Sequence, residues 1–174
     1  ANFDPAGWLW LENPLSQETE VMRASLIPTA LRVQAQNHRH EDGRRLFELQ
    51  RTYQVRENDL PEERSSLVLT YRGGEGAEAQ FQYLKGALDL IMDRYHVSYE
   101  LSRDNVKDQW HPGRAATILV NNEHVGTLGE VHPTVVKNFD LDETVALLEI
   151  DLPMLEPHLK LSPSYTETSE FPPV

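Results

Sequence analysis

Residues 111–133 of the chain read HPGRAATILVNNEHVGTLGEVHP, and this stretch decides the fold. An apolar run at 117–120 leads into the turn residues 121–123 and then into a second segment at 125–131, a pattern that predicts a β-hairpin. A His-Pro pair stands at each end of the stretch. Proline fixes φ and lacks an amide proton, so these pairs suit the ends of strands. The glycines within the stretch suit turns or bulges.

The motifs on either side of the hairpin follow one another in a definite order. They are NPLS at 13–16, VMRASLIP at 21–28, Asn37, RLFEL at 45–49, FQYLKG at 81–86, FDL at 139–141, LEIDL at 148–152 and TSEFPPV at 168–174. With the hairpin, this series resembles the catalytic-like domain of the β subunits of bacterial phenylalanyl-tRNA synthetases. The resemblance covers nearly the whole chain. Its last motif is similar to the lead into the family's C-terminal anticodon-binding domain.

The resemblance implies both a fold and a role. The fold is the core of a class II aminoacyl-tRNA synthetase, an antiparallel sheet flanked by helices. The role is that of a non-catalytic structural domain in the cytoplasm, which packs on the catalytic α subunit of an enzyme that attaches phenylalanine to its tRNA. That whole enzyme uses ATP and Mg²⁺ and binds tRNA. For this domain the resemblance implies no catalytic residue, no cofactor and no metal ligand, so the chain alone is expected to be inactive.

Local patterns favour the same α+β class, with a mostly antiparallel sheet. Apolar residues at the helical period predict a helix over 81–95. Ser16 is expected to cap one earlier helix, and Ser25 to cap another that ends near Asn37. Alternation or apolar runs predict strands at 8–11, 47–53, 67–71, 97–101 and 145–152. Short turns join most of these strands, as in antiparallel sheets.

The predicted core joins the 81–95 helix to the sheet. The helix is expected to contribute Phe81, Leu84, Leu88, Ile91 and Tyr95, and the sheet Phe47, Leu69, Ile118 and Leu148. The strand at 145–152 opens with apolar residues only, which predicts that both of its faces are buried there.

The chain is predicted to contain one domain followed by a linker. Residues 1–156 form the synthetase-like domain, and residues 157–174, rich in Pro, Ser, Thr and Glu, form an extended linker toward a C-terminal anticodon-binding domain. The first residue is Ala1 and the last motif leads toward another domain. The chain is therefore expected to be a piece of a longer protein.

Composition restricts the possible functions. The chain has no cysteine, which excludes disulfides and thiolate metal sites, and no apolar run reaches the roughly 20 residues that span a bilayer. The net charge is −12, and the basic cluster between Arg39 and Arg45 is interrupted by acidic residues. A protein that binds nucleic acid by itself needs a basic face. Most of the contacts with tRNA are therefore expected in other parts of the enzyme.

Three side chains of the hairpin suggest an alternative, a hydrolase or metal enzyme. His111, Glu130 and His132 could hold zinc, or an acid beside a histidine could orient a general base. The other reading is that both His-Pro pairs only mark strand ends. His38 and His40 are a weaker pair, because positions two apart on a helix point to different sides.

Two further features invite a nucleotide-binding interpretation. The glycines around residues 73–76 lack the Lys-Ser/Thr that completes a phosphate-binding loop, so a surface turn is favoured. By the resemblance, ATP binding needs an arginine on a strand at 46–53 and another in a glycine-rich helix near the C-terminal strand. Arg51 is the candidate on the strand, and the glycine-rich arginine motif is missing.

A third possibility remains beside the synthetase domain and the hydrolase. The chain could be a stand-alone synthetase-like module that binds a protein or a small ligand without aminoacylation activity. If the α partner is absent, part of an apolar interface is expected to stay exposed. Trp8, Trp10 and the 26–37 helix are the candidates for that interface, and self-association of the isolated chain is expected.

Overall fold

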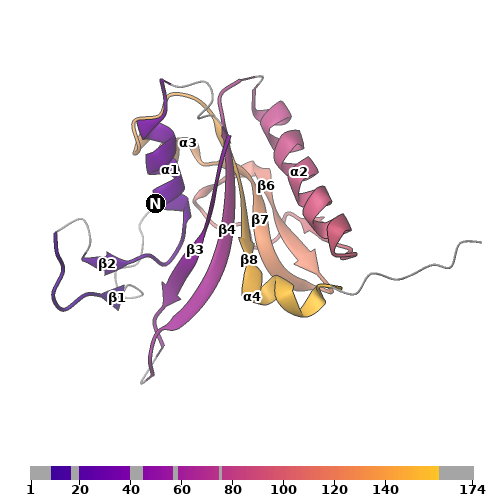
Figure 1. Cartoon of the computed structure of the whole chain (residues 1–174). Coiled ribbons are helices and arrows are strands. Elements are labelled where there is room, and N and C mark those ends of the chain that lie inside the picture. The colour runs from indigo at the N-terminus through magenta and orange to yellow at the C-terminus, as the bar shows by residue number, and fades with distance from the viewer. Residues whose placement is uncertain (1–8, 17–19, 40–44, 57–58, 75, 161–174) are drawn as a thin grey trace, which may run out of the picture.

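The computed structural model of the chain describes residues 9–16, 20–39, 45–56, 59–74 and 76–160. Its centre is a six-stranded sheet in the order β3-β4-β8-β7-β6-β5, and a separate β1–β2 pair lies beside it. Every neighbouring pair of strands is antiparallel. Helices cover both faces of the large sheet, which gives three layers (Figure 1). The predicted α+β class is confirmed.

The bounds of the elements follow in chain order. They are β1 Leu9–Trp10, β2 Val21–Met22, α1 Ile27–Gln36, β3 Arg45–Gln54, β4 Glu62–Arg72, α2 Ala77–Arg94, β5 Glu100–Ser102, β6 Trp110–Val120, β7 Glu123–Val131, α3 Pro133–Lys137, β8 Val145–Asp151, α4 Leu152–Leu155 and the 3-10 helix Glu156–His158.

Each face of the sheet has its own apolar core. On one face α1 and α3 pack on residues that include Val68, Val145 and Leu147. On the other face α2 and α4 pack on residues that include Ile118 and Leu148. Successive side chains of a strand point to opposite faces, so the apolar start of β8 contributes side chains to both cores. The prediction that this strand is buried on both faces is confirmed, since Val145, Ala146, Leu147 and Leu148 are at most 1% exposed.

The hairpin predicted from residues 111–133 is formed by β6 and β7. Its turn residues Asn121 and Asn122 have φ values of 51° and 66°, a left-handed conformation that asparagine tolerates better than most side chains. The pairing shifts between Trp110 and Ala115, and Pro112 lies in that irregular part. A side chain at Gly126 would collide with the main chain of Glu149, so this strand lies unusually close to β8.

The helix predicted over 81–95 is α2, and its buried side is the predicted one. Leu84 and Leu88 are at most 1% exposed, and they share a core with Ile118 and Leu148. The prediction that Phe47 joins this core is wrong, because its side chain is 77% exposed. Phe47 lies on β3, the edge strand, and the described part of the chain has no helix that packs over it on that face.

The N-terminal part of the chain differs from its prediction at one element. The helix expected after Ser16 is not formed at Val21 and Met22, which instead pair as β2 with β1. The second helix is α1, and the hydroxyl of Ser25 accepts a hydrogen bond from the amide of Ile27 (3.1 Å) at its start. The apolar side of α1, with Ile27, Ala30 and Leu31, is buried against the sheet. It is therefore not an open interface.

Residues 157–160, the first part of the predicted linker, pack on the domain. His158 lies 3.2 Å from the carboxylate of Glu123, and the amide of Lys160 donates to the carbonyl of Tyr95 (3.1 Å). Leu159 packs on the α2 core. The structured region thus reaches at least to residue 160. Residues 161–174, like Trp8, lie outside the described residues, so a linker there stays a prediction.

Candidate functional site

The hairpin side chains His111, Glu130 and His132 make local contacts in place of a shared site. Nδ1 of His111 accepts a hydrogen bond from the amide of Gly113 (3.1 Å), and Nδ1 of His132 accepts one from the amide of Thr134 (3.2 Å), which caps α3. Glu130 is buried and forms an ion pair with Arg114, with Nε 2.9 Å from Oε2. Among the described residues, no three His, Asp or Glu side chains converge as metal ligands.

The other weak candidates also have structural explanations. His38 contacts the carbonyl of Ala35 (2.9 Å) at the end of α1, and His40 lies outside the described residues. The glycines at 73, 74 and 76 have positive φ values and form the sharp turn from β4 into α2. The amide of Gly73 donates to the carbonyl of Thr144 (3.1 Å), the residue directly before β8, so this turn is attached to the start of β8.

Arg51, the candidate ATP-binding arginine, lies near the end of the edge strand β3. It forms an ion pair of 2.7 Å with Glu63 on β4, and the two side chains are 67% and 52% exposed. Its positive charge is thus already neutralised by a neighbour in solvent. This is the arrangement of an ordinary surface pair, which contributes little to stability.

The element after β8 is the short helix α4, with the sequence LPML. Leu152, Met154 and Leu155 pack on the α2 core, and Asp151 caps the helix by accepting from the amide of Met154 (3.4 Å). By the synthetase resemblance, a glycine-rich helix with an arginine would stand after this strand. Here the position is filled by apolar side chains that belong to the core.

An open hollow of about 730 Å³ lies between the first turn of α2 and the strands β5, β6 and β7. Its charged side chains are Glu78, Arg103, Arg114 and Glu130, beside apolar Phe81 and Leu101. Arg114 and Glu130 neutralise each other across the hollow's wall. The lining thus carries charges of both signs. Of its two arginines, Arg114 is paired with Glu130, whereas Arg103 has no acidic partner among the described residues.

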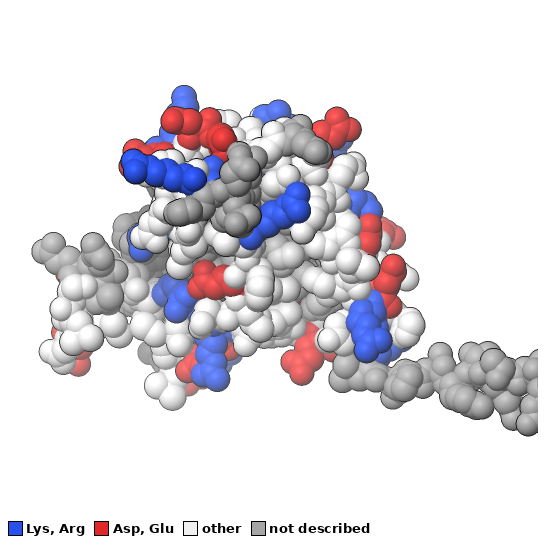
Figure 2. All heavy atoms as spheres, turned by 45° about the horizontal axis from the view of Figure 1, so that its top comes forward, with Lys and Arg blue, Asp and Glu red and all other residues white. Residues whose placement is uncertain are grey.

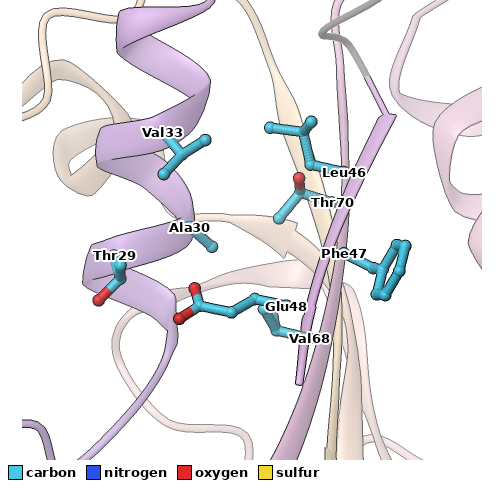
Figure 3. Close-up of a pocket in the computed structure, with 8 residues that line it drawn as sticks. All are labelled: Thr29, Ala30, Val33, Leu46, Phe47, Glu48, Val68 and Thr70. Carbon is cyan, nitrogen blue, oxygen red and sulfur yellow. The ribbon is translucent and has the colours of Figure 1, made fainter. Parts of the chain in front are cut away.

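A smaller hollow of about 220 Å³ lies between α1 and the strands β3 and β4. Thr29, Ala30 and Val33 of α1 face Leu46 and Glu48 of β3 across it (Figure 3). Its walls are mostly aliphatic, and the carboxylate of Glu48 is held by Arg23 at 2.9 Å. The hollow is a packing gap between helix and sheet rather than a reactive centre.

A polar network that the sequence did not reveal joins α1 to the sheet. Arg72, 3% exposed, donates to the side chain of Gln34 (3.2 Å), to the carbonyls of Asn37 and His38 (both 3.3 Å) and to Glu143 (2.6 Å). The guanidinium satisfies the free carbonyls at the C-terminal end of α1, where a positive charge is favourable. A lone arginine after an apolar strand was the signal in the sequence, but its partners are far away along the chain.

Glu149 of β8 makes a separate polar contact on the same face of the sheet, near the start of α1. The hydroxyl of Ser25 donates to its carboxylate (3.0 Å). Burial raises the pKa of Glu149 above the usual glutamate range, and the hydrogen bond from Ser25 offsets part of this effect. The folded protein therefore holds a proton on Glu149 over a pH range in which the unfolded chain has lost it.

Replacing Glu149 by glutamine is expected to stabilise the protein at pH 7. The pKa of the folded state is raised, so the carboxyl contributes fully to stability below the unfolded pKa and loses this contribution as the pH rises through the folded pKa. Glutamine carries no charge and can still accept from Ser25. Its advantage in melting temperature over the original protein should be present at pH 7 and shrink toward pH 4.

Glu100→Gln is the matched control, because Glu100 is an exposed carboxylate on β5. It should shift the melting temperature far less, and its effect should not share the pH dependence of Glu149→Gln. Equal pH profiles for the two variants would contradict the assignment of the burial effect to Glu149.

The outer surface carries charges of both signs. Figure 2 shows Lys and Arg interspersed with Asp and Glu over the end of the molecule where α1 and α2 meet the turns. This mixture gives no broad basic face in that view, in line with the overall charge of −12. No described helix is both long and apolar enough to cross a bilayer.

The fold matches that of class II aminoacyl-tRNA synthetases. A pyrrolysyl-tRNA synthetase from Desulfitobacterium hafniense superposes with a TM-score of 0.66 at 15% sequence identity, over 89% of this chain and 55% of that one. A crystal structure of pyrrolysyl-tRNA synthetase from the same organism gives a TM-score of 0.63 at 14% sequence identity, over 92% of this chain and 59% of that one. At such low identity the likeness shows the shared fold alone.

The family is defined more narrowly by sequence. The chain belongs to the family of the phenylalanyl-tRNA synthetase β chain CLM domain, whose model matches residues 4–152. The phenylalanine–tRNA ligase β subunit of Clostridium tetani is 31% identical over 94% of this chain, and that of Geobacter metallireducens is 36% identical over 83%. The chain spans 21% and 20% of the lengths of these two relatives. The resemblance seen in the sequence motifs is thus confirmed.

Proposed function

We propose that the chain is a non-catalytic structural domain of a phenylalanine–tRNA ligase β subunit, and that it packs on the catalytic α subunit in the cytoplasm. In this proposal the whole enzyme binds ATP, Mg²⁺ and tRNA, and this domain supplies a rigid support. The membership of the chain in the family supports the assignment to the β subunit. The support for a structural role comes from the chain's own residues.

The observation that carries the non-catalytic role is the filling of both faces of β8. Adenylate formation in a class II synthetase needs arginines on the central sheet that hold the phosphates. Here β8 is buried by aliphatic side chains on both faces, and the helix after it inserts leucines into the core. Arg51 is engaged with Glu63 at the sheet edge. Such a centre suits a supporting role, because β8 itself carries no arginine that could hold a phosphate.

The hydrolase or metal-enzyme alternative loses its support, because Glu130 is paired with Arg114 and both imidazoles accept amide hydrogen bonds. The stand-alone binding module remains the competitor. The two proposals differ in one respect, which is whether the chain binds a phenylalanine–tRNA ligase α subunit.

The test is co-purification of the whole chain with a tagged phenylalanine–tRNA ligase α subunit, followed by analytical sedimentation of the mixture. A stable complex is expected. Trp10 is 55% exposed on β1, and an exposed tryptophan is a frequent anchor of protein interfaces. Trp10→Ala should weaken the complex by about tenfold or more, as the loss of such an anchor does.

Leu60→Ala is the control, since Leu60 is 80% exposed in the connection between β3 and β4. It should leave the complex intact. A mixture that sediments as two separate proteins at every concentration would refute the proposed role and favour the stand-alone module. A complex that Trp10→Ala weakens no more than Leu60→Ala does would remove Trp10 from the interface.

A further inference from the structure

An apolar strip remains uncovered between α2 and β3, on the face of the sheet that α2 occupies. Phe47 and Leu49 of β3 are 77% and 56% exposed, and Tyr83 and Leu90 of α2 are 47% and 73% exposed. Phe47 points away from α1, toward the α2 side (Figure 3). The ring of Tyr83 lies 4.3 Å from the guanidinium of Arg45, so this flank of α2 faces β3. Leu90 follows Tyr83 by about two helical turns and shares that flank.

The apolar strip continues into a hollow of about 560 Å³ beside α4. Leu49, Leu67 and Ile91 line this hollow, together with apolar side chains of the C-terminal turns. The strip lies on the face of the sheet, so it is independent of the main-chain edge of β3, where residues 23 and 24 already make hydrogen bonds. A contiguous set of large exposed apolar side chains marks a docking site.

The dimensions of the apolar strip fit one α-helix. Helix α2 packs mainly on β8 and β7, and no helix of the described residues packs over β3 on this face. Two neighbouring strands such as β3 and β4 are about 10 Å wide, which is the diameter of a helix with its side chains. The flank of α2 from Tyr83 to Arg94 is about 16 Å long at about 1.5 Å per residue, so the strip accommodates a helix of about eleven residues.

An unpaired arginine stands at each end of the apolar strip. Arg45 lies between the rings of Tyr71 and Tyr83, at 4.6 and 4.3 Å, and donates to the hydroxyl of Tyr71 (3.2 Å). Arg94 stands in the last turn of α2. Neither arginine forms an ion pair with an acid of the described residues.

The two arginines indicate the charge of the occupant. The aromatic rings hold the guanidinium of Arg45 in place, so it is preorganised to bind a carboxylate. The chain as a whole has a net charge of −12, so two unpaired cations beside one apolar strip are a local reversal of charge. One acid, Glu156, lines the hollow next to α4. The balance favours an occupant that is apolar in the middle and acidic at both ends.

We propose that the apolar strip is the docking site of one α-helix from the part of the β subunit that lies outside this chain. This helix carries an apolar stripe and an acidic residue near each end, about eleven residues apart, opposite Arg45 and Arg94. The chain spans 21% and 20% of the lengths of two relatives, so most of such a subunit is available to supply the helix. The inference rests on the proposed assignment to a β subunit.

The size of the apolar strip favours an occupant in the same polypeptide over a separate protein. A strip about 10 Å wide and about 16 Å long is far smaller than the roughly 800 Å² that each partner buries in a stable interface between separate proteins. A covalently linked segment is present at a high effective concentration, so a small docking site is sufficient. The contact is thus internal to the β subunit and distinct from the proposed contact with α.

Cysteine labelling tests whether the docking site is filled in the complete β subunit. This chain has no cysteine, so Leu90→Cys places one thiol on the strip, and Gln82→Cys places one on the exposed outer side of α2. In the isolated chain both thiols should react with a maleimide at similar rates. In the complete β subunit, Leu90→Cys should react at least about tenfold more slowly, because a linked segment competes at millimolar effective concentration.

Gln82→Cys is the matched control and should react equally fast in both proteins. Mass spectrometry of the peptide that carries the new cysteine gives each rate without interference from other thiols. If Leu90→Cys reacts equally fast in the isolated chain and in the complete subunit, the proposal is overturned. The labelling uses the β subunit without α, so a failure of α to bind refutes the proposed function and leaves this result unaffected.

Photo-cross-linking identifies the occupant. Leu90→p-benzoylphenylalanine in the complete β subunit, in the presence of its α subunit, should give a product that joins residue 90 to a helical segment of the same subunit outside this chain. Mixing light and heavy isotope-labelled β subunits separates this product from a link to a second copy. A product with α, with a second β subunit or with another part of residues 1–174 would overturn the proposal, as would the absence of a product.

The charge of the occupant is tested by removing the two arginines. In the complete β subunit, Arg45→Gln combined with Arg94→Gln should speed the labelling of Leu90→Cys by about threefold or more, a size typical of exposed ion pairs. Arg51→Gln is the control, because Arg51 lies on the same face of β3 but is already paired with Glu63 at 2.7 Å. Equal labelling rates for the double variant and the control would overturn the acidic character of the helix.

Discussion

Replacing Leu88 by alanine is expected to lower the free energy of unfolding by about 2–5 kcal/mol, the range for a leucine truncated in a packed core. Leu88 is fully buried at the middle of α2, in the core that this helix shares with β6, β7 and β8. The truncation leaves a cavity between helix and sheet that neighbouring side chains fill only in part. Urea denaturation followed by circular dichroism measures the loss.

Leu90→Ala provides a matched control in the same helix. Leu90 is 73% exposed, so the identical change removes almost no buried surface. Alanine is at least as good a helix former as leucine, and a surface change of this kind should alter stability by no more than about 0.5 kcal/mol. If the two variants lose equal stability, α2 does not pack on the sheet through Leu88.

The second large effect is the complete absence of amino acid activation by this chain alone. With phenylalanine, ATP and Mg²⁺, pyrophosphate exchange should stay at background, and calorimetric titration should show no tight ATP binding. The reaction concentrates negative charge on a transferring phosphate and needs preorganised cations there. Arg51 is bound to Glu63, and the chain carries a net charge of −12, which repels ATP.

A complete phenylalanine–tRNA ligase serves as the positive control for this assay. Adding its α subunit to the chain should restore little exchange, because the chain spans about a fifth of the length of the relatives. Arg51→Ala should change nothing, since the baseline is already at background. Robust exchange by the chain alone, abolished by Arg51→Ala, would reverse the non-catalytic assignment and identify Arg51 as a phosphate ligand.

The elements predicted best from the sequence are those whose pattern is complete within one segment. The 81–95 helix shows its buried face in the spacing of Leu84 and Leu88, and the hairpin shows its turn in the Asn121-Asn122 pair. The apolar start of β8 predicted correctly that both faces of this strand are buried. Each of these features depends on local periodicity or turn chemistry, which a single sequence records.

Features that depend on distant partners were predicted poorly. Phe47 alternates with polar neighbours as a half-buried strand does, but β3 is the edge of the sheet, and no helix of the described residues packs over Phe47 there. Val21 and Met22 are extended because β1 pairs with them. The anchoring role of Arg72 depends on Gln34 and Glu143, which are far from it in sequence.

The alternative site at His111, Glu130 and His132 was suggested by the sequence for a related reason. His111 and His132 recur at the hairpin ends because each accepts an amide hydrogen bond two residues ahead, which suits the strand ends before proline. The sequence gives the residue types but not the partner of Glu130, which is Arg114 across the hairpin. Without that partner, a buried acid between two histidines resembles a reactive centre.

The position of β8 determines when the domain can assemble. Two hairpins, β3–β4 and β6–β7, can form from neighbouring segments, but the sheet joins them only through β8, which pairs Leu69 with Leu148 on one side and Leu128 with Leu148 on the other. Contacts this distant along the chain slow folding, on the order of milliseconds to seconds for domains rich in such pairings. During synthesis, the edges of β4 and β7 that later pair with β8 remain unpaired until residues 145–151 leave the ribosome. The domain therefore folds at the end of its own translation, and the waiting hairpins are the stage at which chaperones would be needed.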